Sequence, residues 1–70
     1  MKTISSTMAG SIFLINIEVG DQVAAGQDII ILESMKMEVP VTSNSDGVVK
    51  EIRVQVGDFV NEGDPLVIIE

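Results

Sequence analysis

The residue best suited to chemistry in this sequence is Lys36, which lies in the stretch Glu33-Ser34-Met35-Lys36-Met37-Glu38 near the middle of the chain. Two methionines flank the lysine, two carboxylates stand just outside them, and apolar runs follow on both sides. The sequence contains no Cys and no His, so chemistry beyond binding has to depend on a lysine, a carboxylate or a hydroxyl. We interpret Lys36 as a covalent attachment point at the exposed tip of a hairpin.

Lys36 is not expected to catalyse a reaction by itself. An exposed lysine is almost entirely protonated at neutral pH and is therefore a poor nucleophile. A hairpin tip offers neither the burial nor the nearby cation that activates catalytic lysines. Acylation by a separate enzyme is chemically reasonable, because that enzyme can supply the base and the activated acyl group. The alternative is that Lys36 is a solvated turn residue without a chemical role.

The neighbours of Lys36 allow a functional and a purely structural interpretation. Met35 and Met37 carry flexible, polarizable side chains that suit a surface recognised by another protein, but they could also fold back and pack on the end of the domain. Glu33 and Glu38 are candidate contacts for a modifying enzyme, or else solvated carboxylates at strand ends. No catalytic residue and no metal-ligand spacing is identified elsewhere in the sequence.

Composition limits the classes of function. The 70 residues predict one domain spanning residues 1–70, with a net charge of −7 and only four Lys and Arg residues. Four scattered cations form no basic patch, so no nucleic-acid partner is expected and binding to an anionic membrane is disfavoured. No apolar run approaches the ~20 residues of a spanning helix. We expect a soluble protein of a reducing compartment, the cytoplasm, in agreement with the absence of Cys.

An internal repeat organises the chain. A shift that places Gly10 on Gly47 aligns the two halves without a gap. The identical pairs include Gly10/Gly47, Ile15/Ile52, Val19/Val56, Gly20/Gly57, Asp21/Asp58, Val23/Val60, Gly26/Gly63, Ile31/Ile68 and Glu33/Glu70. Two copies are too few for a solenoid, so we expect the halves to pack on each other about a pseudo-two-fold axis.

Each copy is predicted to form β-strands, because β-branched residues dominate and helical spacing is absent. Alternating apolar residues predict half-buried strands, and continuous apolar runs predict strands deep in the core. The expected half-buried strands are Leu14–Val19 and Glu51–Val56, the core strands are Ile29–Leu32 and Leu66–Ile69, and the outer strands are Lys2–Thr7 and Glu38–Ser43. Turns are expected at Gly20 and Gly57, where glycine permits a positive φ and the following Asp can bond the local backbone.

The position of the lysine follows from this pairing. If residues 38–43 return along residues 29–33 through a hairpin, symmetry pairs residues 2–7 with residues 66–70. The turn at Ser34–Met37 then occupies one pole, and the two chain ends lie together at the other pole. Lys36 has no equivalent in the second copy, because that position is where the chain begins and ends.

The sequence resembles the biotinyl domain of biotin-dependent carboxylases. Met35-Lys36-Met37, preceded by Glu33-Ser34, followed by Glu38 and placed at the join of two half-repeats, is similar to the motif of that family. The similarity is greatest to free-standing biotin/lipoyl attachment proteins and to biotin carboxyl carrier subunits of acetyl-CoA carboxylase. It implies an all-β fold, a flattened β-barrel of two four-stranded antiparallel sheets with the lysine at a hairpin tip.

The resemblance also implies a function. Biotin protein ligase would join biotin to Lys36, and the arm would carry carboxyl groups between biotin carboxylase and carboxyltransferase sites. The chain would be a carrier and not an enzyme. Lipoate at the same lysine is the alternative cofactor, although lipoyl domains carry Asp-Lys-Ala where this chain has Met35-Lys36-Met37. An unmodified structural module, like the hairpin domains of efflux adaptors, is the third hypothesis.

Overall fold

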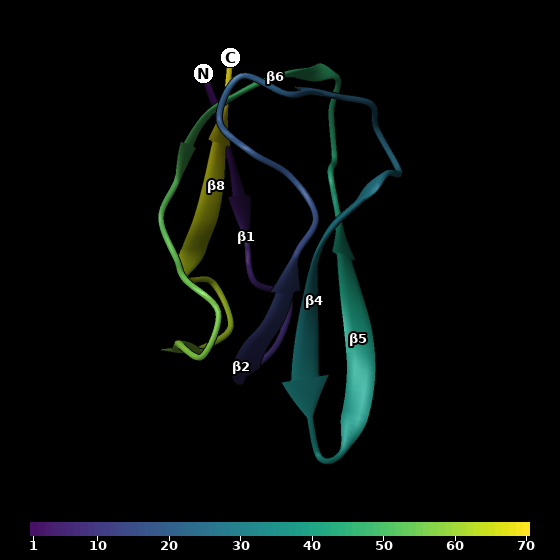
Figure 1. The fold of residues 1–70 in the computed structure, drawn as a ribbon, viewed down its shortest axis with the longest axis vertical. Coiled ribbons are helices and arrows are strands. Elements are labelled where there is room, and N and C mark those ends of the chain that lie inside the picture. Colours follow the sequence, from purple (N-terminus) through teal and green to yellow (C-terminus); the bar gives the residue numbers. More distant parts are fainter.

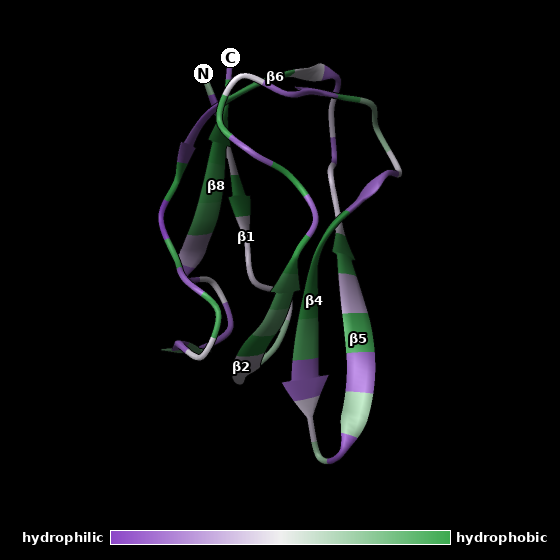
Figure 2. Cartoon of the chain, viewed as in Figure 1, coloured by the Kyte–Doolittle hydropathy of each residue, from purple (hydrophilic) through white to green (hydrophobic).

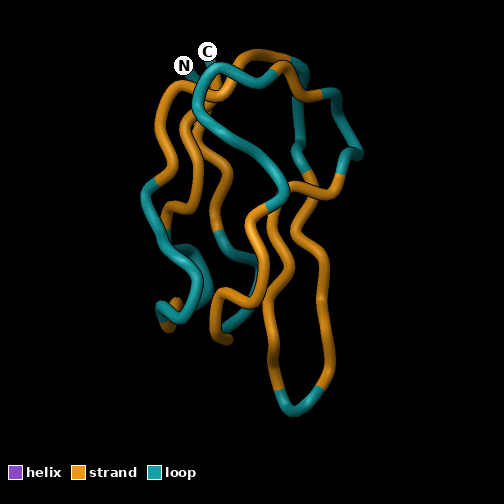
Figure 3. Tube along the Cα trace, viewed as in Figure 1, coloured by secondary structure: helices purple, strands orange, loops and turns teal.

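The computed structural model describes residues 1–70 as eight β-strands joined by turns, with no helix (Figures 1 and 3). The strands are β1 (Lys2–Ser5), β2 (Gly10–Ile15), β3 (Gln22–Val23), β4 (Asp28–Ser34), β5 (Met37–Thr42), β6 (Gly47–Ile52), β7 (Phe59–Val60) and β8 (Pro65–Ile69). No helix of the length and apolar character needed to cross a membrane occurs in the chain.

The strands form two four-stranded sheets, in the orders β1-β8-β6-β3 and β5-β4-β2-β7, and all pairs are antiparallel. The first four strands correspond one by one to the last four, so the repeat that places Gly10 on Gly47 converts one sheet order into the other. Each sheet contains strands from both halves of the chain. The predicted all-β barrel with internal two-fold symmetry is confirmed.

The predicted pairing of the outer strands is also confirmed. β5 returns along β4 through a hairpin, and β1 pairs with β8 in the equivalent way. The molecule measures 31 × 18 × 18 Å. Figure 1 shows the β4–β5 hairpin at one end of the long axis and both chain termini at the other end. The hairpin is therefore the single element that projects from its pole.

The prediction of strands at residues 14–19 and 51–56 was wrong in its boundaries. β2 and β6 begin at the glycines of the repeat and end at Ile15 and Ile52, before the second half of each predicted segment. Val19 and Val56 lie in exposed turns instead of on a buried face. The alternation of apolar residues continues past the strand ends because Ile17 and Val54 still pack on the core from loops.

A single core lies between the sheets. It contains thirteen buried residues, which are all Ile, Leu or Val. Its centre is formed by the two continuous apolar runs, where Ile29, Ile30, Leu32, Leu66 and Val67 have no exposed surface. Burial of an aliphatic side chain of this size contributes about 1.5–3 kcal/mol, so these two strands supply a large part of the hydrophobic stabilisation. This rigid base supports the hairpin.

The predicted glycine turns adopt the expected conformation. Gly20 and Gly57 have φ values of 97° and 98°, a region that side chains with a Cβ rarely occupy. The carboxylates of Asp21 and Asp58 each accept a hydrogen bond from the backbone N–H three residues earlier, at 2.8 and 2.9 Å. These two carboxylates therefore have a local structural role in closing the turns.

Candidate functional site

The candidate site is the tip of the β4–β5 hairpin. Ser34 pairs with Met37 in the last rung, and Met35 and Lys36 form a two-residue turn between them. Both turn residues have positive φ, 52° for Met35 and 63° for Lys36, which is the backbone of a type I′ turn. This turn normally uses Asn and Gly, so each of these side chains costs roughly 1–2 kcal/mol of backbone strain. The predicted turn at Ser34–Met37 is confirmed, at a cost in folding energy.

The side chains of the tip do not pack on the protein. Met35 is 93% exposed and Met37 is 65% exposed, so the alternative in which they fold back on the domain is wrong. Lys36 is exposed as well. The structure has two ion pairs, Lys50–Glu70 at 3.6 Å and Arg53–Glu51 at 3.7 Å, and Lys36 belongs to neither. The Lys36 ammonium group is therefore open to an approaching protein.

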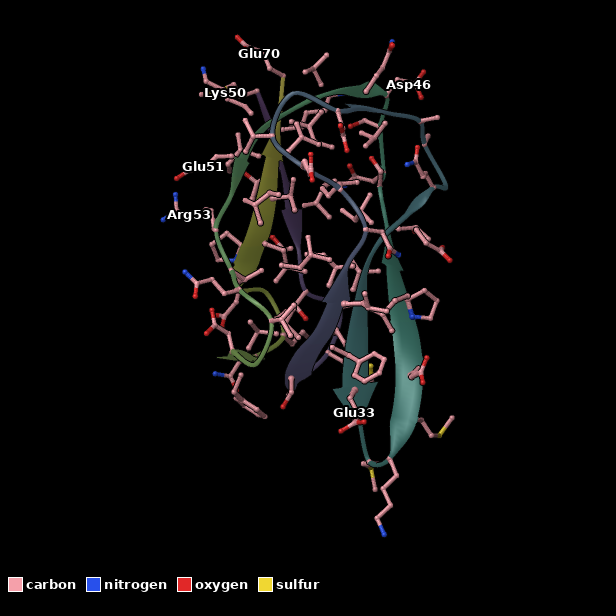
Figure 4. The ribbon with its side chains drawn as sticks, viewed as in Figure 1. Glu33, Asp46, Lys50, Glu51, Arg53 and Glu70 are labelled. Carbon is pink, nitrogen blue, oxygen red and sulfur yellow. The ribbon has the colours of Figure 1, made fainter.

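Glu33 and Glu38 lie directly opposite each other, one rung away from the tip. Both are exposed, and neither takes part in an ion pair. Figure 4 shows Glu33 beside the hairpin end, whereas the labelled residues of both ion pairs lie on the other side of the molecule, toward the opposite pole. The two free carboxylates give the base of the tip a local negative charge.

Gly10 supports the hairpin from the neighbouring strand. An ideal Cβ on Gly10 would lie 2.9 Å from the Glu33 carbonyl oxygen and 3.4 Å from the Ser34 Cβ, so β2 can approach the hairpin this closely only with glycine. Gly47 has the equivalent place in the other half, where a Cβ would collide with the Ile69 side chain and lie 2.8 Å from the Glu70 carbonyl oxygen. The second copy thus preserves the support, but its hairpin is replaced by the chain ends.

The hairpin presents an exposed lysine and lies apart from the pocket of the chain. No group of three or more carboxylates is placed to hold a metal ion. The one pocket, of about 330 Å³, is lined by residues 53–54, 58–60 and 64–65 and includes no residue of the hairpin. The chemistry available at the tip is that of one accessible primary amine.

Comparison with known proteins identifies the family. The family model described as "Biotin-requiring enzyme", of the biotin/lipoyl type, matches residues 2–69. The chain belongs to the biotin/lipoyl attachment family. This biotin/lipoyl attachment domain is 50% identical over 64 residues to the biotin/lipoyl attachment protein of Bacillus subtilis, and the match spans 91% of this chain and 88% of that protein. The family predicted from the lysine motif and the half-repeats is therefore confirmed.

Larger proteins contain a similar domain. The chain is 43% identical over 65 residues to the mitochondrial propionyl-CoA carboxylase alpha chain of Homo sapiens, spanning 93% of this chain but 9% of that one. The crystal structure of the Kluyveromyces lactis urea carboxylase superposes with a TM-score of 0.92 at 35% identity, over 99% of this chain and 6% of that one. The barrel is thus the fold of a small part of these carboxylases.

Two features of the site were not predicted from the sequence. The left-handed conformations of Met35 and Lys36 were not foreseen, although a two-residue hairpin loop requires positive φ at both positions. The contact of Gly10 with the hairpin was also missed. Its signal was the alignment of Gly10 with Gly47, since a glycine at the start of both copies indicates a close approach of the backbone in both sheets.

Proposed function

We propose that this chain is a biotin carrier whose attachment point is Lys36. The observation that supports this most directly is the state of Lys36, an exposed lysine without an ion-pair partner on a strained turn at one pole of a rigid barrel. Strained backbone of this kind is retained where it serves function. Here it holds the lysine at the extreme end of the molecule, where no other part of the chain covers it.

The attachment requires a separate enzyme. A solvated ammonium group has no free electron pair, and the tip holds no base that could take its proton. A biotin protein ligase would supply that base together with a biotinyl group activated at its carboxyl carbon. The Lys36 Nζ would lose protons and form an amide bond to that carbon, and the activating group would leave. The positive charge of Lys36 is lost in the product.

The residues of the chain then hold and limit the movement of the arm. When bound, biotin supplies a ureido nitrogen that can take up and release a carboxyl group. The four methylenes of Lys36 give the arm reach and mobility, while the β4–β5 hairpin fixes its origin. Tethering replaces free diffusion with a high effective concentration near each active site that the domain visits.

The side chains around Lys36 have a proposed role in recognition. Met35 and Met37 expose flexible thioether side chains that can adapt to the surface of a ligase. Glu33 and Glu38 offer carboxylates that no cation of the chain neutralises, so a Lys or Arg of a ligase can pair with them. Biotin carboxylase and carboxyltransferase subunits are the proposed partners of the modified form. The chain itself is proposed to be non-catalytic.

Intact mass spectrometry tests the attachment point. The purified chain is incubated with a bacterial biotin protein ligase, biotin and MgATP, and we expect one biotinyl mass increment. Lys36→Arg should abolish it. Lys2→Arg and Lys50→Arg are matched controls, since they change the only other lysines of the chain, and both should retain the increment.

Two results would contradict the proposal. An increment that survives Lys36→Arg places the attachment elsewhere, and no increment on the wild-type chain removes the biotin assignment. The same assay with a lipoyl ligase and lipoate separates the two cofactors, because efficient modification there and none with biotin would assign the chain to the lipoyl carriers.

A further inference from the structure

The sheet that carries the hairpin has an apolar patch, defined as the exposed residues Phe13, Leu14, Pro40 and Phe59 and the half-buried Ile31. Phe13 lies at the register shift of β2, between Ile12 and Leu14. Leu14, Ile31 and Pro40 form one row across β2, β4 and β5. Phe59 pairs with Ser11 at the edge of the same sheet. Phe13, Leu14 and Phe59 are 43%, 46% and 67% exposed. Several exposed apolar residues on one face of a sheet mark an interaction site more often than a single exposed residue does.

The other sheet serves as an internal control, because its backbone is equivalent. At four of the five positions the repeat places Lys50, Glu51, Gln22 and Thr3 where the patch has Phe13, Leu14, Phe59 and Pro40, and the fifth is isoleucine in both halves. The two sheets therefore differ at these four positions. Both sheets have the same irregularity, since the strand register shifts between Ile12 and Leu14 and again between Val49 and Glu51. Figure 2 shows the contrast, with β2 largely hydrophobic and the end of β6 hydrophilic. The fold therefore does not require apolar residues at these positions.

Unpaired acidic groups border the patch. Glu33 and Glu38 lie in the row that also contains Ser11 and Phe59, two residues nearer the tip than the row of Leu14, Ile31 and Pro40. On the other side, Phe59 helps to line the pocket of about 330 Å³, whose wall contains Asp58, Asp64 and one cation, Arg53. Arg53 pairs with Glu51 and with neither aspartate. The equivalent charged face of the other sheet is different, because its Lys50 and Glu51 pair with Glu70 and Arg53.

The charges around the patch favour one kind of binding partner over another. A second copy would bring its own acidic rim against this one, and the chain has a net charge of −7, so self-association is opposed. A protein surface with apolar residues bordered by Lys or Arg is complementary. Strand spacing of about 4.8 Å places Phe59, two strands from Glu33, roughly 10 Å from the base of the hairpin. A partner that works at the tip can therefore cover the patch at the same time.

We propose that the apolar patch is the docking face for the biotin protein ligase that modifies Lys36, an inference that rests on the proposed function. The ligase has to bring its reacting atoms to the Lys36 Nζ, which lies only roughly 6 Å from its own Cα because the side chain spans five bonds of about 1.5 Å. Its body must then contact the domain beside the hairpin. A partner that acts at the far end of a long arm has no such requirement.

Initial rates of biotinylation at varied chain concentration test this proposal, with a bacterial biotin protein ligase, biotin and MgATP. The test variant is Phe13→Lys/Phe59→Gln, which installs the residues found at the equivalent positions of the other sheet. We expect its KM to rise about tenfold or more with kcat changed less than about twofold, because docking surface is lost and the tip is intact. The matched control is Val48→Ser, which removes an exposed apolar residue from the other sheet and should leave both constants unchanged.

The outcomes are distinct. A wild-type chain that is not modified overturns the proposed function and this inference with it. A wild-type chain that is modified, with an unchanged KM in the double variant, overturns the docking face alone, as does a fall in kcat without a change in KM. Sedimentation that shows a wild-type dimer dispersed by the double variant assigns the patch to a second copy. If thermal unfolding shows that the double variant is not folded, Phe59→Gln alone on the edge strand β7 carries the same test.

Discussion

Glu33 of β4 and Glu38 of β5 face each other across one rung of the hairpin, and no cation of the chain pairs with either carboxylate. Like charges directly opposite each other on antiparallel strands destabilise the pair. The rung precedes a turn in which Met35 and Lys36 both adopt strained conformations. The hairpin therefore combines two destabilising features, the facing carboxylates and the strained turn. We propose that it is retained because it presents Lys36.

Neutralising one carboxylate of the facing pair should stabilise the fold. We expect Glu38→Gln to raise the free energy of unfolding by up to about 1 kcal/mol at low ionic strength, with a smaller gain at high salt, since the repulsion is screened. Urea unfolding at two salt concentrations measures this. Glu62→Gln removes the same charge from an exposed position outside the hairpin and should have little effect. The same Glu38→Gln variant should raise the KM of biotinylation, and a KM equal to that of the wild type would contradict the recognition role.

A glycine in the strained turn should raise the stability of the protein but lower the rate of biotinylation. Met35→Gly is expected to raise the free energy of unfolding by about 1 kcal/mol, because glycine accepts a positive φ without strain. The same variant should be biotinylated more slowly, because it loses an exposed side chain and stiffness at the tip. Ser34→Gly is the matched control in the adjoining strand, where φ is not positive, and it should be destabilising. A destabilised Met35→Gly variant would show that the turn is not strained.

Two equivalent glycines allow a symmetric test of how the hairpin is supported. Gly10→Ala and Gly47→Ala should each lower the free energy of unfolding by about 1–3 kcal/mol, since each new methyl group meets a neighbouring carbonyl oxygen. The loss should be larger for Gly47→Ala, whose methyl group also collides with the buried Ile69 side chain. Gly10→Ala should also reduce the rate of biotinylation, because its methyl group pushes on the Glu33 carbonyl at the base of the hairpin. Gly47→Ala contacts the chain ends at the other pole and should leave that rate unchanged while the protein is folded. Equal rates of biotinylation for the two variants would show that the close approach of Gly10 to the hairpin does not affect the modification of Lys36.

The buried strand β4 should dominate the stability of the domain. Leu32 has no exposed surface, so Leu32→Ala is expected to cost about 2–5 kcal/mol of unfolding free energy. Leu14 is an exposed residue of the same type on the neighbouring strand, and Leu14→Ala should change that free energy by less than about 0.5 kcal/mol. Chemical denaturation of both variants measures the difference. Similar losses at the two positions would contradict the assignment of β4 to the core and of Leu14 to the surface.

Several properties were readable from the chain because they are local or repeated. The composition of β-branched residues predicts strands, and the alignment of Gly10 with Gly47 predicts both the two-fold symmetry and the pairing of β1 with β8. Lys36 has no repeat equivalent within residues 1–70, and the structure places its hairpin at the pole opposite the two termini. The glycines at positions 20 and 57 predict left-handed turns, because few other residues accept that backbone.

Other properties depend on contacts between segments that lie far apart in sequence. The alternation of apolar residues predicts a strand at residues 14–19, but the strand ends at Ile15. Ile17 lies in a loop and is buried in the core, and an alternating sequence pattern does not distinguish such a residue from one in a paired strand. Met35 and Met37 are exposed because the hairpin extends past Gly10, the residue at which β2 begins. Only the register of the sheet determines how far it extends. The residue types of the two outer faces can be read from the sequence. Only the tertiary structure shows that Phe13 and Phe59 belong to the sheet that carries the hairpin. The reason is that side chains share a surface when their strands are neighbours in the sheet, whatever their distance in sequence.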